Sequence, residues 1–158
     1  MAEKVKRKLQ AIFLNVTPES ETPTFEIVGL NVNDLNIEYN PQTNTEIDIL
    51  SDTAKIEVTG YQPTAPVVQQ ATKGDAVFDY INGLRKNRAV LDDATTTAVL
   101  VDMYDGTENS YPAEKQEVSI QIDSYGGTGG EPLSIGYTLN FKGDAVAGIF
   151  NTSTKTFT

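Results

Sequence analysis

The chain has 158 residues, with 22 Asp and Glu against 12 Lys and Arg, and a formal net charge of −10. This length favours a single domain over residues 1–158, and a surface this acidic should repel DNA over most of its area. Cys and His are both absent, which excludes disulfides, thiolate nucleophiles, the commonest general base and the usual transition-metal ligand, so we expect no enzyme, no catalytic residue, no cofactor and no metal.

The first segment is a basic N-terminal arm at about residues 1–8, with four bases and one acid. It has no interleaved aromatic residues, so a solvated or subunit-contacting arm is favoured over a nucleic-acid site. It also lacks the apolar run of a signal peptide, and no later stretch approaches the roughly 20 apolar residues of a membrane span. We expect synthesis in a cytoplasm and no membrane partner.

Alternation of apolar and polar residues predicts strands near residues 8–16, 24–30 and 35–39. A β-hairpin follows at about residues 43–60, in which Ile47 and Ile49 alternate with acids before the turn and Ile56 and Val58 after it. The hairpin should therefore have one apolar face and one acidic face, and the acidic face contains Glu46, Asp48 and Glu57.

One segment has the spacing of a helix, at about residues 75–88. Asp75 is placed to cap its N-terminus, and three basic residues complement the negative end of the helix dipole, namely Arg85, Lys86 and Arg88. Four apolar residues form one stripe that should pack on a sheet: Val77, Phe78, Ile81 and Leu84.

Further strands are predicted near residues 96–104, 117–123, 133–141, 145–150 and 154–158. The second and third should pair as an antiparallel hairpin, because the glycine-rich segment 124–132 between them is a wide loop. The short repeat KGDAV, at 73–77 and 142–146, is interpreted as a turn in both places. The predicted fold class is all-β with one flanking helix, as a sandwich or barrel of about eight or nine strands.

Three features resemble sites and are interpreted otherwise. The glycine run 126–130 is followed by a strand and not by GK[ST] and a helix, so a plain loop is favoured over a phosphate cradle. The acidic segment 102–109 does not match an EF-hand, which favours a solvated loop. Paired carboxylates could serve a glycosidase, but nothing marks one pair among the 22 acids.

Several stretches in order resemble major tail tube proteins of long-tailed, non-contractile bacteriophages of Gram-positive hosts. The similarity spans roughly residues 35–158 and rests on IEYNPQTNTE at 37–46, KGDAVFDYINGLRKNRA at 73–89, VLVDMY at 99–104, VSIQIDSYGG at 118–127, LSIGYTLNFKGD at 133–144 and IFNTSTKTF at 149–157. The first 30 residues match less clearly.

The resemblance implies two packed β-sheets flanked by a helix, and self-assembly into hexameric rings that stack into a tube. It also implies a lumen through which DNA passes without specific binding, and loops and arms that reach into the next ring. The expected partners are other copies of the chain and the tape measure, tail terminator and tail tip proteins. The expected location is the virion tail, assembled in the host bacterial cytoplasm.

Charge suggests which residues would serve such a tube. Each Lys or Arg on a phosphate adds sequence-independent adhesion, so a lumen lined by carboxylates would let DNA slide. The candidate lumen residues are Glu46, Asp48, Glu57, Glu117 and Asp123, and the alternative is that these are outer-surface charges. The helix bases Arg85, Lys86 and Arg88 are candidates for a subunit interface with acidic neighbours.

A second interpretation is a β-sandwich binding or adhesion module of a phage tail tip or cell surface. Such a module would share the strand pattern and the acidity. It should differ in having exposed aromatic residues clustered on one face, and it need not polymerise.

Overall fold

The computed structural model describes residues 2–158, and in them the chain forms a β-rich fold with one α-helix, α1 (Ala76–Asn87). Short 3₁₀ helices lie at Arg7–Leu9 and Leu91–Ala94. The strands are β1 (Gln10–Asn15), β2 (Phe25–Ile27), β3 (Val32–Leu35), β4 (Pro41–Glu46), β5 (Lys55–Tyr61), β6 (Thr64–Gln70), β7 (Thr95–Asp102), β8 (Tyr111–Gly126), β9 (Ser134–Asn151) and β10 (Thr156–Phe157). The predicted class, all-β with one flanking helix, is confirmed.

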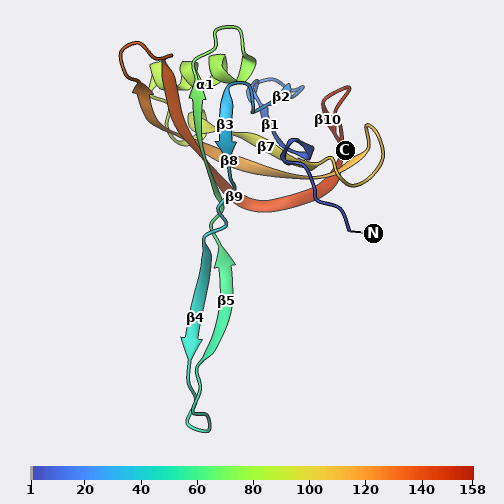
Figure 1. Ribbon diagram of the computed structural model, residues 1–158, viewed down its shortest axis with the longest axis vertical. Coiled ribbons are helices and arrows are strands. Elements are labelled where there is room, and N and C mark those ends of the chain that lie inside the picture. The colour runs from blue at the N-terminus through green and yellow to red at the C-terminus, as the bar shows by residue number, and fades with distance from the viewer. Residues whose placement is uncertain (1) are drawn as a thin grey trace.

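Eight of these strands form one antiparallel sheet in the order β2-β1-β7-β8-β9-β6-β3, with β10 paired to the end of β9. The edge strands β2 and β3 are joined by only residues 28–31, so the sheet must curl until its two edges approach each other. Figure 1 shows this curled half-barrel with α1 lying across it. The resemblance implied two packed sheets, and the structure instead has one curled sheet plus a separate two-stranded hairpin, β4–β5.

The larger core lies between α1 and the sheet. Alternate residues of β1, β6, β7, β8 and β9 point to this side, as the period-2 pattern predicts. The buried residues of α1 are the four that helical spacing selected, Val77, Phe78, Ile81 and Leu84. From the strands they meet Ile12, Leu14, Leu35, Ala65, Val67, Ala98, Val118, Ile120, Ile135, Tyr137, Leu139 and Phe141.

A buried polar chain joins the start of α1 to the sheet. The Asp75 carboxylate accepts a hydrogen bond from the backbone N–H of Phe78, at 3.2 Å, and so caps the helix. The same oxygen accepts from the side-chain amide of Gln69, which is fully buried on β6. Gln69 in turn accepts from the Tyr137 hydroxyl on β9. The helix start is therefore fixed by specific bonds as well as by apolar packing.

A smaller core lies on the opposite face of the sheet, near β1 and β7. The Phe13 and Phe150 rings pack with centroids 4.6 Å apart, and Phe25 meets Phe150 edge-on at 6.0 Å. Phe157 on β10 closes this cluster from outside. It lies directly over Gly148, where an added β-carbon would come 2.5 Å from the ring, so this position requires glycine. The last strand thus covers apolar surface that would otherwise face solvent.

The structure corrects the predicted strands in three places. The segments predicted at 133–141 and 145–150 form one strand, β9, because Gly143 (φ +73°) makes a bulge in it and not a turn. Ile47 and Ile49 lie in the hairpin turn, beyond the end of β4. The strand expected at 35–39 ends at Leu35.

Strand β6 was not predicted, since Pro66 interrupts its alternating pattern. Thr64 and Gln70 direct their N–H groups away from β9, to the carbonyls of Glu38 and Asn31. Pro66 lies an even number of residues from both, so the N–H that proline lacks would also point away from β9, toward β3. The pairing of β6 with β3 is irregular, with a shift in register. The proline therefore removes no regular ladder bond.

Asp75→Ala should destabilise the folded chain by about 2–3 kcal/mol, because it removes the helix cap and leaves the buried Gln69 amide short of a partner. Asp79→Ala, on the exposed side of the same first turn, should change stability by less than about 0.5 kcal/mol. Urea unfolding followed by circular dichroism measures both. Equal losses in the two variants would contradict the role given to Asp75.

Stability should fall at high pH because of Tyr137. Burial, with a smaller contribution from Asp75, raises the pKa of the Tyr137 hydroxyl above its usual 10.0. Above that pH the tyrosine ionises in the unfolded chain and not in the folded one, so the unfolded state is favoured by up to about 1.4 kcal/mol per pH unit. Tyr137→Phe should reduce this slope in unfolding measurements between pH 9 and 11, and a slope unchanged by the substitution would contradict it.

Candidate interaction surfaces

The most prominent feature is an arm formed by β4 and β5, which projects from the body of the protein (Figure 1). The two strands pair from Pro41–Tyr61 to Glu46–Lys55 and join no other sheet. At its base the Tyr39 and Tyr61 rings meet edge-on, and the Asn40 amide donates to the Gln62 carbonyl and the Thr64 hydroxyl. An isolated two-stranded hairpin is at best marginally stable in water, so this arm lacks the usual support of a sheet.

The arm has two different faces. Cross-strand pairing places Ile56 and Val58 on one face, opposite Thr45 and Thr43. The other face contains Asn44, Glu46, Lys55 and Glu57, with a Lys55–Glu57 ion pair at 2.9 Å. Since both members of this pair are well exposed, the bond adds little stability.

The tip of the arm is apolar and uncovered. Ile49 and Leu50 are 100% and 92% exposed, and neighbouring Ile47 is 63% exposed. The Asp48 carboxylate accepts from the Leu50 N–H and shapes the turn. Turns normally consist of polar residues. Two large aliphatic residues in a predicted turn are therefore unusual, and this feature of the sequence could have identified the tip as an exposed apolar surface.

A second surface is the polar half of the sheet face that points away from α1. Register places short rows of polar side chains across β7, β8, β9 and β6, such as Thr95, Ser119, Asn140 and Thr64. Neighbouring rows contain Glu117 beside Lys142 and Gln121 beside Thr138.

Many donors on this polar face are already used within the chain. Asp123 accepts from both Gln121 and Thr138, and Gln121 accepts from Asn140 at 3.3 Å. Lys142, the one basic side chain in these rows, donates to the Thr95 hydroxyl at 2.9 Å. The face therefore presents mostly neutral polar groups and carboxylates to solvent.

The five acids proposed as lumen residues do not form one cluster. Glu46 and Glu57 share a face of the arm, and Asp48 lies in its turn. Glu117 and Asp123 lie on the polar face of the body. The structure thus divides these residues between two surfaces, the arm and the polar face of the body.

The three helix bases also differ from one another. The Arg85 guanidinium stacks on the Tyr125 ring, 3.8 Å from its centroid, and donates to Asn82. Arg88 ends the helix in the left-handed conformation. Lys86 and Arg88 are exposed, so they are the two bases of the three that are most available to another molecule.

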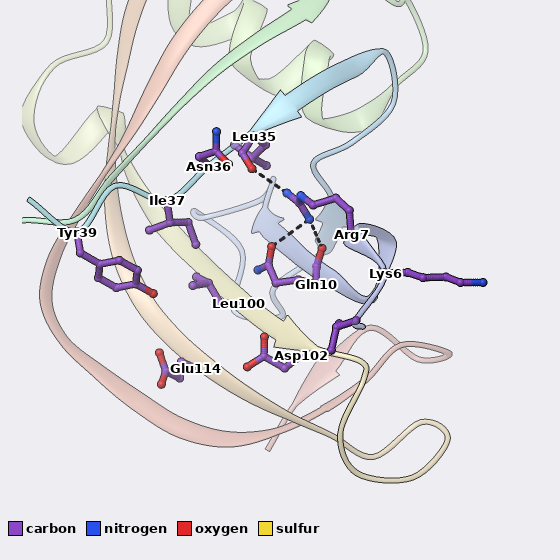
Figure 2. A pocket seen from close by; sticks show the side chains of 11 residues that line it. Lys6, Arg7, Gln10, Leu35, Asn36, Ile37, Tyr39, Leu100, Asp102 and Glu114 are labelled. Atoms are coloured by element: carbon purple, nitrogen blue, oxygen red, sulfur yellow. Dashed lines mark hydrogen bonds between the residues drawn. The ribbon is translucent and has the colours of Figure 1, made fainter. Parts of the chain in front are cut away.

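A shallow pocket of about 410 Å³ lies where the N-terminal arm crosses the sheet. Figure 2 shows Arg7 holding that arm in place, with hydrogen bonds to the carbonyls of Leu35 and Gln10. Burial raises the pKa of the Tyr39 hydroxyl at its edge, as do the nearby Glu114 and Asp102 carboxylates to a lesser extent. This pocket is open and of mixed polarity, and offers acceptors and a phenol but no arrangement of nucleophile and base.

A separate groove is predominantly apolar. It has a volume of about 620 Å³ and lies between β1 and β2 on one side and β3 on the other. Ile27, Val28, Leu30 and Val32 line it, and Arg7 and Lys8 lie at its rim. Sequence reasoning did not find this groove, because it exists only where the two edges of the curled sheet approach each other.

Residues 2–158 contain no group of three or more Asp, Glu, His or Cys side chains placed to hold a metal ion. In the same range, no helix is both long and apolar enough to cross a membrane.

Comparison with known proteins identifies the fold. None of the protein-family models matches the sequence, and none of the curated proteins does. A chain from the tail of an empty GTA particle, solved with C6 symmetry, superposes with a TM-score of 0.65 at 15% identity, over 90% of this chain and 98% of that one. A chain from the sheath/tube terminator of PVC, an extracellular contractile injection system, gives 0.50 at 15% identity, over 92% and 97%. The chain therefore has the fold of these tail and tube-terminator proteins.

Proposed function

We propose that this protein is a structural subunit that assembles into six-membered rings, and that the rings stack into a phage tail tube. The observation that supports this most strongly is the fold, which matches almost the whole of a chain from a C6-symmetric tail. The projecting arm supports it as well, because an exposed apolar hairpin is stable only when another surface covers it.

Two structural features suit such an assembly. The arm points away from the body, so its tip is free to contact another copy (Figure 1). Within a ring, β9 offers a joint, because β6 pairs with it only up to Asn140 and no strand within residues 2–158 pairs with the exposed segment 142–147 on that side. Open strand edges are a liability in a monomer and a natural contact between subunits.

The lumen, in this proposal, is lined by carboxylates and neutral polar groups. The polar face of the body supplies Glu117 and Asp123, and the acidic face of the arm supplies Glu46 and Glu57 while Ile56 and Val58 pack on a neighbour. DNA would pass without specific binding, because few free ammonium or guanidinium groups are available to hold its phosphates. Carboxylates within a Debye length, about 8 Å, of the phosphates add repulsion.

The sequence resemblance over residues 35–158 supports a narrower setting. It supports the proposal that the tube belongs to the virion tail of a long-tailed, non-contractile phage of a Gram-positive host and is assembled in the bacterial cytoplasm. The tape measure, tail terminator and tail tip proteins are then the partners at the inside and ends of the tube. A structural role of this kind requires no catalysis.

The alternative, a binding or adhesion module, requires clustered exposed aromatic residues. Among the described residues the exposed tyrosines are Tyr39, Tyr61, Tyr104 and Tyr125, and only the first two pack together. Tyr125 is covered by Arg85. No broad aromatic platform for a sugar is formed, so the observations favour the tube.

Negative-stain microscopy of the purified protein over a range of concentrations tests the proposal directly. Hollow tubes or six-fold rings are expected above a threshold concentration, because each contact between subunits is weak and an assembly is stable only when many such contacts form together. A chain that stays monomeric at every concentration, alone or with a tail-tip extract as nucleus, would rule out the tube subunit.

Lys86→Glu should raise the threshold concentration for assembly severalfold, since it places a negative charge where we propose that an acidic neighbour docks. Unfolding should change by less than about 1 kcal/mol, the size of a helix-dipole effect. Lys73→Glu is the matched control, because it reverses an equally exposed lysine outside the proposed interface. Sedimentation velocity measures assembly. An equal rise of the threshold concentration in both variants would show that the helix bases are not part of the interface.

A further inference from the structure

Among the exposed apolar side chains of residues 2–158, two groups lie beside charged segments of opposite sign. One is the tip of the arm, with Ile49 and Leu50 almost entirely in solvent. The other is the groove beside β1, β2 and β3, where Leu30 and Ile27 at the rim are 52% and 46% exposed. Two such patches on one molecule suggest that each is buried by the other in an assembly.

The charges around these two surfaces have opposite sign. Residues 46–57 of the arm contain four carboxylates and one lysine, for a net charge of −3. Residues 3–8 contain four bases and one glutamate, for a net charge of +3, and Arg7 and Lys8 from that segment lie at the groove. Asp34 is the single acid among the groove residues, so the rim remains positive.

Figure 1 shows that the arm points away from the body, so a tip cannot reach the groove of its own chain. An arm that occupies a groove therefore belongs to a second copy. We propose that the tip of one copy, residues 47–50, inserts into the groove of the next, with Ile49 and Leu50 against Leu30 and Ile27. The N-terminal bases then lie beside Asp48 and Asp52 of the turn.

The contact joins two different surfaces, so it is head-to-tail and each copy keeps one free tip and one free groove. An interface of this kind does not close on itself as a dimer does, and it generates rings or open-ended stacks. This inference rests on the proposed tube and gives the residues of one of its contacts. Its charge complementarity also makes association sensitive to ionic strength.

Because the chain has no cysteine, single cysteines can report this contact without background. Ile49→Cys labels the tip, Leu30→Cys labels the groove, and Val68→Cys, exposed on β6, is the control acceptor. The tip variant is mixed with each acceptor in turn and treated with a short bifunctional maleimide. Mass spectrometry then counts the cross-linked pairs, and sedimentation velocity on the same mixtures reports assembly.

The expected result is about tenfold more tip–groove than tip–control product. If assemblies form and the tip reacts equally with both acceptors, this inference is wrong and the tube proposal stands. If the selective product forms but nothing larger than short oligomers appears, the contact is supported and the tube is contradicted. If neither assembly nor a selective product appears, both are wrong.

A double substitution provides a second measurement that does not depend on the reagent. Ile49→Ser with Leu50→Ser removes the apolar tip, lies outside both cores, and should leave the circular dichroism of the free chain unchanged. The threshold concentration for assembly should rise at least about tenfold, since two aliphatic side chains no longer leave water. Val68→Ser with Leu133→Ser, two exposed apolar residues outside the proposed contacts and outside both cores, should leave it within about twofold, and an equal effect in both pairs would overturn the inference.

Discussion

The pairing of β8 with β9 is the interaction on which the rest of the structure depends. These are the two longest strands, and their ladder extends from Tyr111–Phe150 to Gly126–Ser134. One half of it presents Val118, Ile120 and Leu139 to the helix, and the other half presents Ala113 and Phe150 to the smaller core. One ladder can supply both cores because successive residues of a strand point to opposite faces of the sheet.

Bulges let this long ladder bend. The register shifts between Lys115 and Glu117, opposite the bulge of β9 at Gly143, and the Gln116 amide donates to the Gly143 carbonyl there. A bulge adds local twist and bends the strand, so the sheet can curl around α1 at one end and around the phenylalanine cluster at the other. The curl also brings β2 toward β3 and creates the apolar groove between them.

The same curl explains why the arm is separate from the body. The strands β4 and β5 leave the sheet where β3 ends and β6 begins, so they have no neighbouring strand and share no core. A chain that folded only for its own stability would gain little from this hairpin, since its aliphatic side chains remain in water. Its structure is understandable as half of an interface, and the unpaired stretch of β9 has the same property.

The sequence by itself determined the local elements and the chemistry that is absent. Alternation in residues 133–141, the stripe from Val77 to Leu84, the cap at Asp75 and the lack of His and Cys all depend on neighbours in the chain. The tertiary structure alone decided that Gly143 bends a strand, that Pro66 lies in one, and that the predicted acids are divided between the arm and the polar face. It also created the groove beside Leu30. These outcomes depend on which distant strands pair and in which register, and a pattern of period two is the same for every possible partner.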